Sequence, residues 1–234
     1  DYRIESWLGR FNYNYDEKYY LSASLRTDGS SRFHKDARWG TFWSVGANWR
    51  VSKEAFMEDV EWIDNLSVKA SYGEQGNDNI GTYYAWQSLY SLSYANSNQI
   101  GAFVSTLENK GISWEKNGNL NVGFEAAMFD NRLKLNVEYY NKKTTDMLLN
   151  YPMALSTGFS GYDANVGDMR NSGVEFEIKG TPVRFDDFEW NVTFMGSTTK
   201  NEVLKLTATT PEIISGTRII KEGYPINTFY MAKS

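Results

Sequence analysis

The sequence predicts an all-β protein whose strands form an antiparallel transmembrane β-barrel wall with long extracellular loops. Several stretches of the 234 residues alternate strictly between apolar and polar side chains, and 16% of all residues are aromatic. Successive side chains of a strand point to opposite faces, so each stretch has one apolar and one polar face. The longest stretches reach the roughly 9–11 residues that a tilted membrane strand needs. The links between them are alternately short and long, which is typical of outer-membrane barrels.

The first two strands are expected at Trp7–Tyr15 and Tyr19–Asp28, joined by the tight link Asp16-Glu17-Lys18. Residues that face each other across a hairpin lie on the same side of the sheet. Pairing Tyr15 with Tyr19 therefore keeps the apolar residues of both strands together. On the second strand this apolar face consists of Tyr19, Leu21, Ala23, Leu25 and Thr27.

A third strand, Phe42–Val51, and a fourth, Leu66–Tyr72, are expected after the long link Gly29–Trp39. Between these strands the segment Ser52–Asp64 predicts a short helix with Ser52 as its N-cap. The apolar residues of this segment recur at helical spacing, at positions Phe56, Val60 and Ile63.

The second half of the chain predicts four more strands and two long links. The long links are Glu74–Lys116 and Asn141–Asn171, and the strands are Asn119–Met128, Leu133–Tyr140, Val174–Lys179 and Trp190–Phe194. Asp130-Asn131 forms the turn of the first pair, and pairing Met128 with Leu133 again matches the faces. Pro182–Phe188 joins the second pair. From Lys200 onward the pattern is mixed and leaves room for one further strand.

A soluble β-sandwich shows the same alternation, with its apolar faces packed against each other. Soluble strands average about five or six residues, so the greater strand length favours the barrel. The link lengths and the charges of the polar faces favour it too; these charges are Arg10, Arg26, Arg50, Lys69, Glu125, Glu138, Glu175 and Glu177. Two alternatives remain: a small barrel acting as an anchor or passive pore, and a secreted carbohydrate-binding β-sandwich.

Composition excludes several classes of protein. The apolar fraction is 41%, and no window approaches the roughly 20 apolar residues of a spanning helix. A net charge of −5 argues against a nucleic-acid partner. There is no cysteine, which excludes disulfides and thiolate chemistry. The chain does not begin with Met and is interpreted as a piece of a longer protein.

The sequence shows no arrangement of acid, base and nucleophile, so we expect neither an enzyme nor a cofactor. His34 is the single histidine and is expected to be a solvated loop residue; without cysteine, it argues against a structural zinc site. Asn77-Asp78-Asn79 lacks the spaced acidic residues of a calcium loop. Glu175 and Glu177 share a strand face, as paired glycosidase carboxylates could. We expect them instead to be lumen charges paired with neighbours such as Lys179.

One aromatic-rich loop is the candidate for contact with a substrate. Aromatic faces bury large areas against sugars or peptides at little cost in conformational entropy. The alternative is that these rings pack loop against loop or against a partner protein. The candidate substrate-binding residues are Tyr83, Tyr84, Trp86, Tyr90 and Tyr94.

An ordered series of sequence blocks resembles the SusC/RagA family of TonB-dependent outer-membrane transporters. The most distinctive block is Arg26–Phe33, followed by Trp39-Gly40-Thr41-Phe42; Trp43 departs from the family, which often has Pro there. Further matching blocks are Leu8–Tyr15, Lys69–Gly73, Trp114-Glu115-Lys116, Asn131-Arg132-Leu133 and Asp168–Asn171.

The resemblance implies a barrel of about 22 strands with an internal plug. Residues 1–234 would form part of that barrel domain, about eight strands, and the plug would not be present in this chain. The resemblance also implies nutrient uptake across the outer membrane of a Gram-negative bacterium. The implied partners are a SusD-like surface lipoprotein, TonB through parts outside this chain, outer-membrane lipid, and an oligosaccharide or peptide substrate.

Overall fold

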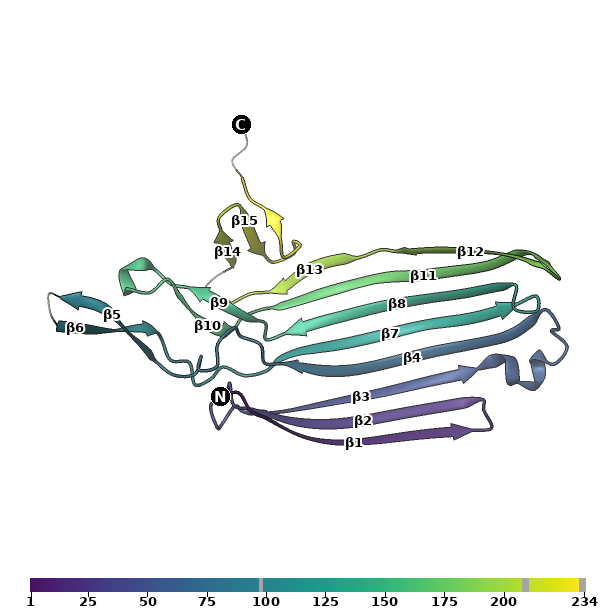
Figure 1. Cartoon of the computed structure of the whole chain (residues 1–234), viewed down its shortest axis with the longest axis horizontal. Coiled ribbons are helices and arrows are strands. Elements are labelled where there is room, and N and C mark those ends of the chain that lie inside the picture. Colours follow the sequence, from purple (N-terminus) through teal and green to yellow (C-terminus); the bar gives the residue numbers. More distant parts are fainter. Residues whose placement is uncertain (97–98, 208–210, 232–234) are drawn as a thin grey trace.

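A computed structural model describes residues 1–96, 99–207 and 211–231, and its main feature is one long, curved antiparallel sheet (Figure 1). Eight long strands lie side by side in the order β1-β2-β3-β4-β7-β8-β11-β12. Their bounds are Ile4–Tyr15, Tyr19–Ser30, Trp39–Arg50, Ile63–Asn77, Glu115–Met128, Leu133–Thr145, Asp168–Phe185 and Phe188–Ser197. β13 (Lys200–Lys205) pairs with the part of β11 that lies nearest the long loops.

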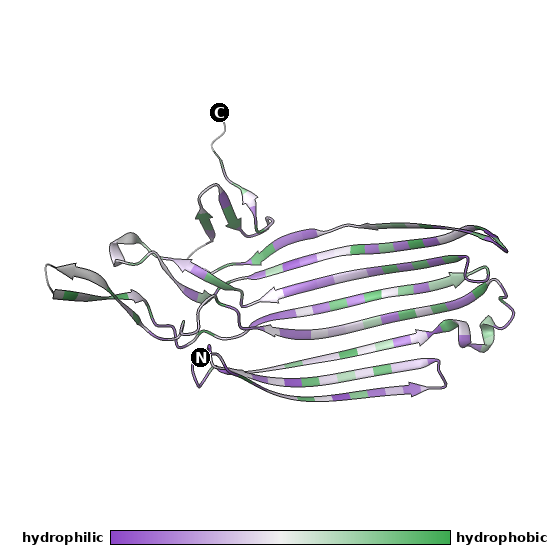
Figure 2. Ribbon diagram, in the orientation of Figure 1, coloured by the Kyte–Doolittle hydropathy of each residue, from purple (hydrophilic) through white to green (hydrophobic). Residues whose placement is uncertain are grey.

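The register of the sheet places the apolar residues of neighbouring strands directly opposite one another. Tyr15 pairs with Tyr19 and Met128 with Leu133, so both hairpin pairings expected from the sequence are confirmed. One cross-strand row contains Tyr13, Leu21, Ala47, Ala70, Val122, Tyr139 and Val174. The sheet therefore has one continuous apolar face and one polar face, visible as alternating colours along each strand in Figure 2.

No second layer formed by the described residues packs against the apolar face. Leu21 is 51% exposed and Phe124 is 38% exposed, and Val45 is exposed as well. A β-sandwich would bury these side chains against a facing sheet. Among the residues that the structure describes, the long strands all belong to one sheet, so the sandwich alternative is wrong. The architecture is that of an incomplete barrel wall.

Short turns lie at one end of the sheet and long loops at the other (Figure 1). The long links contain small hairpins that the sequence did not predict: β5 (Leu89–Asn96) with β6 (Gln99–Thr106), and β9 (Leu148–Pro152) with β10 (Gly161–Asn165). A short 3₁₀ helix, η3 (Leu155–Thr157), lies between β9 and β10. Beyond Lys200 the structure contains β13, which confirms a further strand there. A small sheet follows it, formed by β14 (Glu212–Ser215), β15 (Arg218–Lys221) and β16 (Thr228–Phe229).

The expected helix Ser52–Asp64 is wrong. The chain forms only two 3₁₀ turns, η1 (Val51–Lys53) and η2 (Ala55–Met57), and the N-cap of η1 is Arg50, not Ser52. Glu54 separates the two turns in an extended conformation, with φ −79° and ψ 148°. Its carboxylate is held on the sheet, because it accepts hydrogen bonds from the Tyr19 hydroxyl at 2.6 Å and Trp49 Nε1 at 2.9 Å.

The expected link Pro182–Phe188 is also too long, because β11 continues to Phe185. Proline lacks the N–H that a sheet ladder requires. The register between β11 and β12 shifts between Gly180 and Val183, and this irregularity accommodates Pro182 within the strand.

No helix among the described residues is long and apolar enough to cross a membrane.

Buried apolar side chains gather at the loop end instead of between layers. One cluster contains Phe33, Phe42, Ala85, Ile112 and Trp114. A second contains Val166, Val203 and Leu206. The loops therefore have small cores of their own, which hold them in place at one end of the sheet.

Replacing Phe124 with arginine tests which face meets lipid. We expect Phe124→Arg to lower the free energy of unfolding in lipid vesicles by about 2–4 kcal/mol, because it places a guanidinium among acyl chains. The control Asn121→Arg lies on the polar face and should change stability little. The free energy of unfolding of both variants is measured by urea titration, with the gel mobility of the folded barrel as the signal. Equal losses of stability in the two variants would contradict the assignment of the faces.

Glu54 should contribute stability that depends on pH. Hydrogen bonds from Tyr19 and then from Trp49, with Lys18 nearby, hold the pKa of Glu54 below its usual value. A lowered pKa means that the contribution is present above the unfolded pKa of about 4.3 and is lost as the pH falls through the folded value. We expect Glu54→Gln to destabilise the protein at pH 7, and the difference from the wild type to shrink towards pH 3. Urea titrations at several pH values measure this difference, and one that stays constant with pH would rule the mechanism out.

Candidate functional site

The polar face of the sheet carries an ion pair that reaches across three strands. Lys69 Nζ on β4 lies 3.0 Å from Glu125 Oε1 on β7 and 3.0 Å from Glu138 Oε2 on β8. Lys69 and Glu138 meet across β7 because Gly123 lies between them in the register. A Cβ atom at Gly123 would come within 2.5 Å of the Val137 carbonyl oxygen. Because Gly123 has no side chain, the side chain of Lys69 can cross β7 and reach Glu138 on β8.

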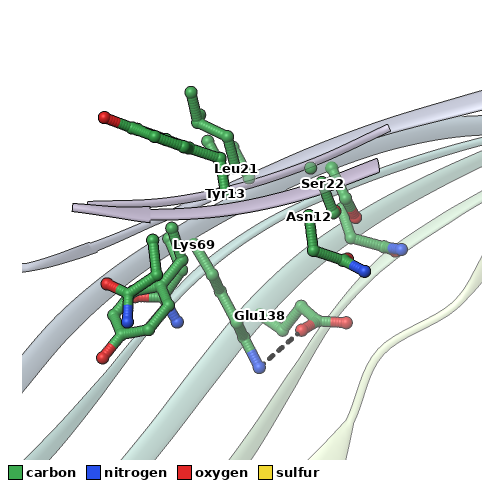
Figure 3. Close-up of a pocket in the computed structure, with 14 residues that line it drawn as sticks. Asn12, Tyr13, Leu21, Ser22, Lys69 and Glu138 are labelled. Atoms are coloured by element: carbon green, nitrogen blue, oxygen red, sulfur yellow. Dashed lines mark ion pairs between the residues drawn. The ribbon is translucent and has the colours of Figure 1, made fainter. Parts of the chain in front are cut away.

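Lys69 and Glu138 line one side of a hollow of about 460 Å³. In Figure 3, Asn12 and Ser22 lie on the same side of the ribbon as Lys69 and Glu138, while Tyr13 and Leu21 point to the other side. The remaining lining is also mostly short and polar, including Asn14, Asn48, Ser71 and Asn121. Amides and hydroxyls both donate and accept hydrogen bonds, so this surface suits water or a polar chain. It holds no nucleophile and base arranged for chemistry.

A second hollow, of about 600 Å³, continues along the same face toward the loops. Many of its lining residues are small, namely Ser22, Ser24, Ser44, Gly46, Ser71 and Gly73. Phe42 and Trp114 line its loop end. The two hollows share lining residues and form one polar surface along β2, β3 and β4.

An aromatic pair closes the place where β3 and β4 stop pairing, beyond Ser44 and Gly73. The ring centroids of Phe42 and Trp114 lie 5.5 Å apart, and Trp114 Nε1 donates a hydrogen bond to the Arg38 carbonyl oxygen at 2.9 Å. The rings lie against the backbones of Gly40 on β3 and Gly76 on β4, where a Cβ atom would collide with Phe42. These glycines permit the close approach of the rings.

The predicted substrate-binding residues lie in two places. Tyr83 and Tyr84 are exposed, and Trp86 is half-buried against the Phe33 cluster, with its ring centroid 5.4 Å from that of His34. Tyr90 is exposed on β5, on a hairpin that projects from the loop end (Figure 1). Tyr94 is also on β5, but its side chain lies outside the described part of the structure. The residues therefore do not form one cluster.

Arg32, which the sequence analysis did not single out, joins three separate segments at the loop end. Its guanidinium lies 4.8 Å from the ring centroid of Tyr2 and 5.3 Å from that of Tyr83. Its Nη1 donates hydrogen bonds to the Asp78 carbonyl oxygen at 3.0 Å and to Asn79 Oδ1 at 3.1 Å. The segment before β1, the β2–β3 loop and the β4–β5 loop are thereby held together. We call this group the Arg32 clasp.

Asp78 is the acceptor at the centre of the Arg32 clasp. Its Oδ2 accepts hydrogen bonds from the Tyr2 hydroxyl at 2.9 Å and from the Ser30 hydroxyl at 2.6 Å. Burial, followed by the hydrogen bond to Asp78, raises the pKa of the Tyr2 hydroxyl. The sequence analysis considered Asp78 only as a calcium ligand. The described residues contain no group of three or more acidic, His or Cys side chains that could hold a metal.

The remaining candidates have structural partners. His34 lies in the β2–β3 loop as expected, but its side chain is mostly covered, with Nδ1 3.2 Å from Asp36 Oδ2. It is therefore not the solvated residue that the sequence suggested. Glu177 Oε1 lies 2.8 Å from Lys179 Nζ, which confirms the expected pairing on the polar face.

A family model described as "TonB dependent receptor-like, beta-barrel" matches residues 1–228. The chain belongs to the TonB-dependent receptor β-barrel family. It is 38% identical to TonB-dependent receptor P26 of Formosa agariphila, over 88% of this chain and 21% of the relative. It is 31% identical to TonB-dependent receptor SusC of Bacteroides thetaiotaomicron, over 97% of this chain and 25% of the relative.

Solved structures agree with the family. The structure of the RagAB peptide transporter matches 99% of this TonB-dependent receptor chain and 26% of its own, with a TM-score of 0.92 and 35% identity. The resemblance to the SusC/RagA family is thus confirmed. The chain spans about a quarter or less of the length of these relatives. They are receptors and transporters and not enzymes, as the sequence predicted.

Removing the guanidinium of the Arg32 clasp should loosen the β4–β5 loop. Charged hydrogen bonds contribute about 1.5–3 kcal/mol and a cation–π contact about 0.5–2 kcal/mol. We therefore expect Arg32→Ala to speed amide hydrogen exchange in residues 77–88 by about tenfold or more, while the strands stay protected. The control Lys35→Ala removes an exposed cation from the same loop and should have little effect. Unchanged exchange in Arg32→Ala would show that the clasp does not hold the loop.

Proposed function

We propose that this chain forms part of the wall of a TonB-dependent importer in the outer membrane of a Gram-negative bacterium. The importer takes up oligosaccharides or peptides together with a SusD-like surface lipoprotein. One observation carries the proposal: the apolar side chains of all the long strands share one exposed face, and the opposite face is polar and hollow. Lipid covers the apolar face, and the polar face lines an aqueous interior.

The two edges of the sheet support a larger barrel. Among the described residues, β1 pairs only with β2, and β12 pairs only with β11. In lipid, unpaired backbone N–H and C=O groups cost several kcal/mol each, so a spanning sheet must close. The relatives are about four times as long as this chain, which leaves ample length for the closing strands. In this proposal the plug and the segment that contacts TonB also lie outside residues 1–234.

The loop end provides surfaces for substrate. Tyr83, Tyr84 and Tyr90 are exposed, whereas Trp86 packs against the buried cluster that contains Phe33. The Arg32 clasp fixes the backbone beneath Tyr83, so that ring is already ordered before a ligand arrives. Fixed aromatic faces bind sugars and peptides at low entropic cost. The RagAB neighbour is a peptide transporter, which supports peptides as one of the two substrate classes.

Uptake by cells tests the proposal. The gene for the full-length receptor is deleted from the host, and in a matched strain it is restored from a plasmid. Both strains are made in a host that has TonB and in a host that lacks it. Fluorescent oligosaccharides and peptides are then offered separately. We expect uptake of one class to require both the receptor and TonB. Uptake that needs the receptor but not TonB would support a passive pore instead. Uptake that is the same without the receptor would overturn the proposal.

The exposed rings make a sharper prediction within the same assay. An aromatic contact contributes about 0.5–1.5 kcal/mol beyond its buried area. We expect Tyr84→Ala combined with Tyr90→Ala to raise the half-saturating substrate concentration by about tenfold, with little change in receptor abundance. The control Tyr224→Ala removes an exposed ring from another loop and should leave this concentration unchanged. Equal effects in both variants would argue against substrate contact at Tyr84 and Tyr90.

A further inference from the structure

The apolar face of the sheet becomes polar and charged toward the loops. On β8 the side chains of Leu133, Leu135, Val137 and Tyr139 are followed on the same face by those of Asn141 and Lys143. In Figure 2 the loop-side part of β8 and the first half of β13 are coloured as hydrophilic. This end of the face is distinct from the hollow polar face, which lies on the opposite side of the sheet.

Basic residues gather at this end of the outward face. Arg170 on β11 pairs directly with Lys143 on β8, and Lys200 on β13 pairs with Ser172 on β11. Lys205 pairs with Asp168, and Lys116 on β7 lies two residues beyond Gly118, the partner of Lys143. We call this group the outer basic cluster; its members are Lys116, Lys143, Arg170, Lys200 and Lys205.

The arrangement within the cluster leaves positive charge pointing outward. Like charges directly opposite on neighbouring strands, such as Lys143 and Arg170, destabilise a sheet unless anions offset them. Three carboxylates do so in part: Asp168, Glu202, and Glu74 on β4, which lies in the same cross-strand row as Gly118 and Lys143. Asp168 Oδ2 lies 3.4 Å from Lys143 Nζ, and Glu202 Oε2 lies 3.2 Å from Arg170 Nη2 and 3.1 Å from Lys200 Nζ.

Asp168 and Glu202 lie beneath the cations, and the three carboxylates are fewer than the five cations of the cluster. The side chains of Asp168 and Glu202 are 25% and 24% exposed, whereas those of Lys143 and Lys200 are 51% and 73% exposed. The carboxylates therefore order the cationic side chains from below. The ammonium and guanidinium groups keep donors free for an anion outside the sheet.

The height of the cluster matches the edge of the membrane core. Lys143 lies about ten residues beyond Leu133, which is about 33 Å along a strand. At the tilt of about 40° that is usual for membrane strands, this corresponds to about 25 Å along the membrane normal. That is the height of the apolar band of such barrels. The turns lie at the other end of the band, so the cluster is level with the headgroups on the loop side.

We propose that the outer basic cluster binds the phosphate of a lipid headgroup in the leaflet on the loop side of the membrane. Arginine donates to phosphate oxygens in a bidentate manner, and lysines add mobile positive charge. The ligand is a lipid phosphate because the cluster continues an apolar surface that receives the acyl chains of the same molecule. The inference rests on the proposed function, since it requires the barrel to lie in a membrane.

Binding of a phosphorylated glycolipid to the purified full-length receptor tests this inference. The probes are fluorescent lipid A and the same lipid after enzymatic removal of its phosphates, both in detergent micelles. We expect the wild type to bind the phosphorylated probe at least tenfold more tightly. In the variant Lys143→Gln with Arg170→Gln this preference should fall below about threefold. The matched control, Lys134→Gln with Lys142→Gln, removes two exposed cations from the opposite face and should keep the preference.

Three results would overturn the inference: equal binding of the two probes by the wild type, an equal loss of preference in the control, or displacement of the lipid by inorganic phosphate at equal concentration. The last result would identify free phosphate as the ligand. Heat-dependent gel mobility reports whether each variant is folded. If the double variant does not fold, the single variant Lys200→Gln replaces it in the assay. Lys200 is the most exposed of the cations paired with Asp168 or Glu202, so this change must weaken binding of the phosphorylated probe.

The lipid assay and the uptake assay fail independently. The outer basic cluster lies away from the polar face, so its variants should transport normally in whole cells. A wild-type receptor that transports normally but binds the two lipid probes equally would overturn only the present inference. A wild-type receptor that prefers the phosphorylated probe but transports nothing would overturn only the proposed import function.

Discussion

The backbone hydrogen-bond ladder between neighbouring strands, kept in a single register, is the constraint on which the rest of this structure depends. Alternation within a strand produces two faces, but only the register joins the faces of different strands into one surface. A slip of one residue would turn the side chains of a whole strand to the opposite face. The exposed apolar surface, the polar hollows and the ion pairs of Lys69 all require that the strands from β1 to β12 avoid such a slip.

The sequence predicted the long strands and their faces because alternation is a local property. Each of the eight strands was placed from its own residues, and the Tyr15–Tyr19 and Met128–Leu133 pairings followed from short turns. The loop end was not predictable in this way. Arg32 Nη1 lies 3.7 Å from the Oδ1 atom of Asp78, which is 46 positions further along the chain, and no local pattern indicates which distant carboxylate an arginine will find. The hairpins β5–β6 and β9–β10 were missed because their alternation is short and irregular.

The segment after β3 shows how a tertiary contact overrides a periodic pattern. Phe56, Val60 and Ile63 have helical spacing, but Glu54 is tied to Tyr19 and Trp49 on the sheet and interrupts the turn. The candidate aromatic residues show a related limit. Composition identified a loop rich in exposed rings, yet it did not distinguish Trp86, which packs inward, from Tyr83 and Tyr84, which do not. That difference depends on Phe33, which is distant in sequence.

Gly123 has a consequence for how such a wall assembles. If β7 shifted by two residues, every apolar side chain would still face outward, so hydrophobicity alone does not reject this misalignment. The shift would, however, place Asn121 or Glu125 between Lys69 and Glu138, where the side chain would block their contact. The absence of a Cβ atom at Gly123 thus distinguishes the correct register of β7 from registers shifted by two residues. During folding, the Lys69–Glu138 ion pair stabilises only the correct register, a distinction that the burial of apolar side chains in lipid does not make.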